Sequence, residues 1–123
     1  MPLLEVELIG GAPAPRRAGL ARRIADAAGV IFESAPGETW VRMRDIARRD
    51  YAENATDTGA AGIRPVFVRI LRRSLPDPGA LAHEIEALTE AVAKETGRPR
   101  EQVHVIHEPP GAGRVAFGGR LVH

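Results

Sequence analysis

The stretches "PLLEVELI" (residues 2–9) and "PVFVRILR" (residues 65–72) decide the fold, because the second repeats the plan of the first. Both begin on proline, which the first position of a β-strand tolerates because its missing N–H removes no ladder bond there. In the first stretch, apolar residues alternate with Glu5 and Glu7, which is the period of a strand with one buried face. We therefore expect two equivalent strands, each opening one half of an internal repeat.

An amphipathic helix is predicted after each of these strands. Apolar side chains recur at helical spacing in both halves, at Leu20, Ile24, Ala27 and Ile31 and then at Leu81, Ile85, Leu88 and Val92. Each set marks one helix face, which packs most simply against the sheet. Asp77, followed by Pro78, predicts the start of the second helix, and Gly97 predicts its end.

A second strand is predicted after each helix, in "TWVRMRDI" (39–46) and in "QVHVIHE" (102–108). The polar, Gly- and Ala-rich segment 50–63 reads as the connection between the halves. A helical crossover between two strands favours parallel pairing within each half.

These elements predict an α/β fold in which two tandem β-α-β units form a four-stranded sheet with two helices on one face. We expect a single domain over residues 1–123, with pseudo-repeats at about 2–50 and 65–119. A sheet left bare on its other face needs a partner, so the architecture implies an oligomer.

Composition excludes several classes of function. The 17 basic residues are nearly balanced by 16 acidic ones, and aromatic residues are only 4% of the chain, so no basic-aromatic surface for nucleic acid is expected. There are no cysteines, which excludes disulfides and thiolate metal sites. No apolar run approaches the roughly 20 residues of a membrane helix, and no signal-peptide pattern is present. We expect no membrane partner and a cytoplasmic protein.

The N-terminal proline, the tandem β-α-β plan and the glycine-rich "GRVAFGG" (113–119) together resemble the tautomerase superfamily. The glycine-rich stretch is similar to the C-terminal hairpin of 4-oxalocrotonate tautomerase-type subunits. A tandem plan in one chain resembles the fused members, such as malonate semialdehyde decarboxylase and its relatives. The resemblance implies a homotrimer that needs no cofactor and acts on small carboxylate substrates.

Pro2 is the catalytic candidate that this resemblance implies. A methionine before a small residue is usually removed in the cell, which would leave Pro2 with a free secondary amine. An ordinary terminal amine has a pKa of about 7.7–8.0, and burial or nearby cations lower it. A neutral amine at working pH can move a proton beside a carbonyl group. Pro65, its counterpart in the repeat, has an internal amide nitrogen with no basic lone pair, so we expect one proline site per chain.

The pair Arg72 and Arg73 is the candidate for binding the substrate carboxylate. It falls, counted from Pro65, where the fused relatives place their carboxylate-binding arginines, whereas Leu75 stands where a second arginine is frequent. Guanidinium groups bind carboxylates through paired, charge-assisted hydrogen bonds. The alternative is that both are surface residues at the end of a strand.

Trp40, Arg42 and Arg44 share one face of the predicted strand 39–46, and so they could line a pocket with an aromatic wall. Arg42 matches by position the strand arginine that polarises substrate in oxalocrotonate-type enzymes. The alternative, of equal weight, is that Arg42 and Arg44 pair with Glu5 and Glu7 across the sheet or a subunit interface.

Glu38 lies where the resemblance implies an acidic residue that orients water or polarises substrate. Its surroundings, "SAPGET" (34–39), are also ordinary turn chemistry. His104 and His107 fall on opposite faces of a strand and cannot chelate one metal ion, so no metal site and no cofactor are expected.

Three functional hypotheses remain open. The first is a cofactor-independent tautomerase that acts on a 2-oxo or 2-hydroxydienoate acid, with Pro2 as general acid and base. The second is a hydrolytic decarboxylase or hydratase of a small oxo acid, in which Pro2 stays protonated and Glu38 assists. The third is a catalytically silent trimeric scaffold, which follows if Met1 is retained and Pro2 keeps its peptide bond.

Overall fold

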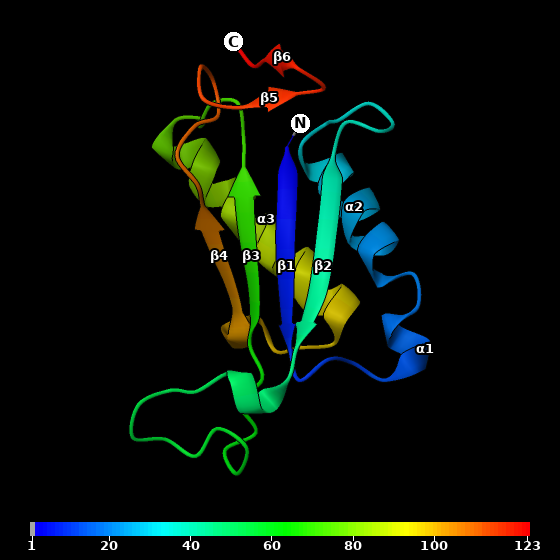
Figure 1. The fold of residues 1–123 in the computed structure, drawn as a ribbon, viewed down its shortest axis with the longest axis vertical. Helices are drawn as coiled ribbons and strands as arrows, with labels where there is room; N and C mark the ends of the chain where they lie inside the picture. The colour runs from blue at the N-terminus through cyan, green and yellow to red at the C-terminus, as the bar shows by residue number, and fades with distance from the viewer. Residues whose placement is uncertain (1) are drawn as a thin grey trace.

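The structure is a computed structural model that describes residues 2–123 (Figure 1). Its first half is a β-α-β unit made of strand β1, short helix α1, helix α2, strand β2 and a 3₁₀ turn, η1. Their bounds are Leu3–Ile9, Ala14–Arg17, Leu20–Ile31, Trp40–Ile46 and Arg48–Asp50. β1 and β2 pair in parallel, as predicted for strands joined by a helical crossover.

The second half repeats this plan with strand β3, helix α3, a 3₁₀ turn η2 and strand β4. Their bounds are Val66–Leu71, Pro78–Thr96, Arg100–Gln102 and Val103–His107. β3 and β4 also pair in parallel. The chain ends in a small hairpin of β5 (Ala116–Phe117) and β6 (Arg120–Leu121), which lies beyond the start of β1 (Figure 1).

The two units join through their first strands. β1 and β3 are antiparallel neighbours, so the sheet has the order β2-β1-β3-β4. Helices α2 and α3 lie behind this sheet in Figure 1, which leaves its front face bare. The predicted four-stranded sheet with two helices on one face is confirmed.

The core lies between the sheet and the two helices. Apolar side chains that are fully buried or nearly so come from both layers: Leu4, Val6, Leu8, Val66, Val68 and Ile70 from the strands, and Leu20, Ile24, Ala28, Leu88 and Val92 from the helices. The predicted stripe on α2 is correct except at one position, where Ala28 rather than its half-buried neighbour Ala27 faces the core. Ala28 continues the four-residue step from Leu20 and Ile24, whereas Ala27 lies at the edge of the same face, because positions three and four residues apart are neighbours on a helix.

The ends of α3 follow the predicted capping chemistry. The Asp77 carboxylate accepts a hydrogen bond of 3.0 Å from the backbone N–H of Ala80 at the helix start. Gly97 ends the helix in the left-handed region, with φ of 72°, which L-residues rarely adopt. The Arg16 guanidinium carbon lies 2.9 Å from the place where a Gly97 side chain would begin, so a larger residue there would also displace this flexible side chain.

Candidate active site

Pro2 lies immediately before β1, the second strand of the sheet, and it is buried. Its carbonyl accepts a hydrogen bond of 3.0 Å from the backbone N–H of Trp40, the first residue of β2. This bond fixes the entry of β1 beside β2. The predicted removal of Met1 concerns a residue outside the described range, which begins at Pro2.

Arg72 lies beside Pro2 because of the antiparallel register. Leu3 of β1 pairs with Leu71 of β3, so the residues one step outward on the two strands are neighbours. The Arg72 guanidinium carbon lies 5.1 Å from the centre of the Phe32 ring, at the end of α2. This is a cation–π contact, and it holds the guanidinium on the face of the sheet that the helices cover.

Glu84, which the sequence analysis did not single out, and His107, which it considered only as a metal ligand, complete this cluster. Arg72 Nη1 donates to Glu84 Oε1 of α3 at 2.5 Å. The other Glu84 oxygen lies 3.3 Å from His107 Nε2 of β4. One signal could have located them: Glu84 precedes Ile85 of the predicted apolar stripe, and His107 alternates with Val103 and Val105 along β4.

Arg73 differs from its neighbour, since it is exposed to solvent. Its backbone is nevertheless held in place: the Arg73 carbonyl accepts from the N–H of Ala112 at 3.1 Å, and the Arg72 carbonyl accepts from Gly111 at 2.7 Å. The chain after β4 therefore fixes this turn while leaving one guanidinium available at its surface.

Trp40 and Phe117 form an aromatic contact at the same end of the sheet. Their ring centres are 4.9 Å apart and their planes are nearly perpendicular, which is a favoured edge-to-face arrangement. The Trp40 indole N–H also donates to the carbonyl of Gly37 at 2.8 Å. Phe117 belongs to the β5–β6 hairpin, so the predicted C-terminal hairpin contributes an aromatic side chain that the sequence analysis had not named.

Glu38 stands two residues before Trp40, at the Pro2 end of the sheet, and it is exposed. Its backbone N–H donates to the carbonyl of Ala35 at 3.0 Å, which closes a turn. The turn chemistry read from the sequence is therefore present, and the same turn places an acidic residue near the start of β1.

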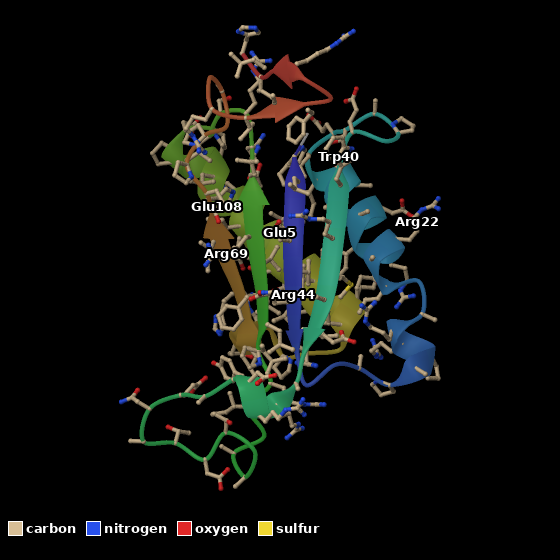
Figure 2. The ribbon with its side chains drawn as sticks, in the orientation of Figure 1. Glu5, Arg22, Trp40, Arg44, Arg69 and Glu108 are labelled. Carbon is tan, nitrogen blue, oxygen red and sulfur yellow. The ribbon has the colours of Figure 1, made fainter. Side chains whose placement is uncertain are left out.

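Arg44 points from the bare face of the sheet (Figure 2), and Arg42, two residues away on the same strand, shares that face. Arg42 pairs with Glu5, and Arg44 Nε donates to Glu7 Oε2 at 3.1 Å, so one of the two open readings of these residues is observed. Trp40 is the residue of β2 whose N–H binds Pro2. Arg42 lies two residues further along the strand, a displacement of about 6.7 Å, and Arg44 lies further still, so both arginines lie away from Pro2 within one chain. With Arg69, they line a hollow of about 410 Å³ on this face.

Tyr51 and Glu53 form a contact in the connection at the opposite end of the sheet from Pro2. The Tyr51 hydroxyl donates to Glu53 Oε2 at 2.5 Å, and this bond to an anionic acceptor, with burial, raises the pKa of Tyr51 to about 12. Tyr51 therefore keeps its proton at neutral pH.

Two other kinds of feature are absent from residues 2–123. Within that range, no helix combines the length and apolarity needed to cross a bilayer. The same residues contain no cluster of three or more His, Asp or Glu side chains arranged to hold a metal ion.

Comparison with known proteins gives structural matches only. No family model and no curated protein matches the sequence. The symmetric trimer of a wild-type fused 4-OT shares 19% identity over 98% of this chain and 95% of its own, with a TM-score of 0.78. A protein solved after inactivation by 2-oxo-3-pentynoate shares 17% identity over 98% and 96%, with a TM-score of 0.78. The macrophage migration inhibitory factor from Trichinella spiralis shares 8% over 97% and 98%, with a TM-score of 0.73.

Proposed function

Since the chain has the fused-type fold of the tautomerase superfamily, we propose that it is a cofactor-independent tautomerase. Pro2, freed by removal of Met1, would be the general acid and base. The substrate would be a small 2-oxo or 2-hydroxydienoate carboxylate. At these identities the likeness carries the fold, and the activity rests on the arrangement around Pro2.

The observation that carries this proposal is the placement of Pro2. It is buried at the start of β1, held by Trp40 of β2, and adjacent to Arg72 through the register with β3. Burial and a neighbouring cation both disfavour the ammonium form of a terminal amine. A fixed amine that is neutral near pH 7 is suited to proton transfer.

The proposed reaction moves one proton. The neutral Pro2 amine accepts the proton of the 2-hydroxy group, the C–O bond becomes a carbonyl, and the conjugated double bond shifts. The ammonium then returns the proton to carbon, which regenerates the amine. The exposed Arg73 guanidinium would bind the substrate carboxylate by paired hydrogen bonds, and the Trp40 and Phe117 rings would line the site.

A second candidate function uses Glu38. Its turn lies two residues before Trp40, whose N–H donates to the Pro2 carbonyl, so an acidic residue lies at the same end of the sheet. In this alternative Pro2 stays protonated, and Glu38 assists the addition of water to a small oxo acid, with decarboxylation or hydration as the outcome. In the turn after β3, Leu75 stands where the decarboxylase-type relatives place a second arginine. Because that alternative depends on two arginines, this difference favours the tautomerase.

The experiment that tests the proposed function follows ketonisation of 2-hydroxymuconate and of phenylenolpyruvate by ultraviolet absorbance. The protein is first shown by intact mass to lack Met1. Turnover above the uncatalysed rate supports the tautomerase. Absence of turnover in trimmed protein removes the proposal for these substrates, and retention of Met1 in the cell favours the silent scaffold.

We further propose that the bare sheet face is the interface of a homotrimer. Matched structures of fused 4-OT are trimers, and this face carries exposed apolar side chains beside its ion pairs. Ile106, for example, is 37% exposed on β4, on the face opposite the core. In such an assembly Arg42, which lies far from Pro2 in its own chain, could reach the Pro2 of a neighbour.

Replacing Ile106 by glutamate is expected to convert the trimer to monomers, because assembly would bury an uncompensated charge. The measurement is the molar mass by sedimentation equilibrium. Val30→Glu is the matched control, since Val30 is 79% exposed on α2, away from the bare face. A trimer in both variants would contradict the assignment of this face.

A further inference from the structure

The Glu84 carboxylate links two basic side chains from different elements. One oxygen accepts from Arg72, after β3, at 2.5 Å, and the other lies 3.3 Å from His107 of β4. The side chains of Glu84 and His107 are only 11% and 10% exposed, and that of Arg72 is 24% exposed. A carboxylate used at both oxygens in a largely buried place has a defined position.

This cluster lies at the Pro2 end of the sheet. Arg72 is one step outward from the pair Leu3 and Leu71, and so it neighbours Pro2. Its guanidinium is held from one side by the Phe32 ring and from another by Glu84. Arg72 is therefore occupied by protein groups, in contrast to the exposed Arg73.

We propose that Glu84 is a positioning residue that holds Arg72 beside Pro2, with His107 against its other oxygen, and sets the net charge at the site. The proposal rests on the proposed role of Pro2 as an acid and base. It gives the two arginines different roles, since Arg72 is a fixed cation compensated by Glu84, whereas Arg73 is the ligand for the substrate carboxylate.

The sign of the effect follows from electrostatics. A neighbouring cation lowers the pKa of an amine, and a neighbouring carboxylate raises it. Removing the charge of Glu84 leaves Arg72 uncompensated, so the pKa of the Pro2 amine falls. Removing the charge of Arg72 leaves Glu84 uncompensated, so the same pKa rises. A residue that only supported the fold would not produce opposite shifts.

Other titratable or charged groups at this end of the sheet contribute a common background. They come from the segments after α2, before β2 and after β3, from β4 and the segment after it, and from the C-terminal hairpin: Glu33, Glu38, Arg73, His107, Glu108, Arg114 and Arg120. Because the variants leave these groups in place, the difference between variants reports on Arg72 and Glu84.

The test measures the Pro2 amine directly. Met-trimmed protein is labelled with ¹⁵N-proline, and the one proline nitrogen that titrates is followed from acid to alkaline pH in wild type, Glu84→Gln and Arg72→Gln. We expect the pKa to fall by about 0.5–1 unit in the first variant and to rise by about as much in the second. Glu86→Gln is the matched control: it is on the same helix, but its carboxylate pairs with the exposed Arg100 at 3.0 Å.

An unchanged pKa in both folded variants, or shifts of the same sign, would overturn the proposal. If Glu84→Gln does not fold, Arg72→Gln still decides by its sign. The titration needs no substrate, so its result is separate from the proposed function. Opposite pKa shifts without turnover would support the proposed role of Glu84 and count against the tautomerase. Turnover without opposite shifts would support the tautomerase and overturn the proposed role of Glu84.

Discussion

Pro2→Ala is expected to lower kcat/KM for ketonisation by about 10²- to 10⁴-fold, which is the usual contribution of a positioned general acid and base. The variant keeps a terminal amine after trimming, but it is a primary amine without the ring that fixes its direction. Inserting a lysine between Met1 and Pro2, which blocks trimming, should remove the activity more fully because the nitrogen becomes an amide with no basic lone pair. Both are measured by absorbance, with intact mass to establish the N-terminus.

The control for this prediction is Pro65→Ala. Pro65 heads β3 as Pro2 heads β1, and it is equally placed in the repeat, but its nitrogen lies within the chain. Its carbonyl accepts from the N–H of Ile9 at 3.2 Å, a bond that alanine preserves. We expect kcat/KM within a few-fold of wild type. Equal activity in Pro2→Ala and wild type would eliminate Pro2 as the base.

Arg98→Met is expected to reduce the free energy of unfolding by about 3 kcal/mol, the largest effect on stability that we predict. Arg98 is 7% exposed and donates to three backbone carbonyls in separate segments: those of Ile9 at 3.0 Å, Gly11 at 2.6 Å and Arg64. Methionine fills much of the space but leaves these acceptors without their charged donor. Burial, with nearby Arg64 and Arg48, lowers the pKa of Arg98, so desolvation offsets part of the gain from these bonds.

The measurement is urea unfolding followed by circular dichroism, together with thermal melting, in which a drop on the order of 10 °C is expected. Arg22→Met is the matched control. Its side chain is 82% exposed and pairs with Asp26 one turn along α2, an ion pair expected to contribute no more than about 0.5 kcal/mol. Similar stabilities of the Arg98 and Arg22 variants would show that the three carbonyls find other donors.

The candidate site was predictable from the sequence where its chemistry follows from local position. Pro2 at the head of the first strand, the arginine pair after the third strand and the glycine-rich hairpin could each be located from strand boundaries and the repeat. The choice between Arg72 and Arg73 could not, because it depends on which of them meets Glu84, and that requires the position of α3 over the sheet. Arg42 and Arg44 were likewise undecided until the register placed them opposite Glu5 and Glu7.

The elements and their repeated order follow from the amino-acid pattern alone, because alternation and helical spacing are properties of a few consecutive residues. Leu4, Val6 and Leu8 on one face of β1, and Asp77 and Gly97 at the ends of α3, needed no distant partner to be read. The pairing of charges, in contrast, depends on tertiary packing. Glu84, His107 and Phe32 come from three elements, and Arg98 joins segments almost ninety positions apart, so their contacts arise from how the layers pack rather than from any local pattern.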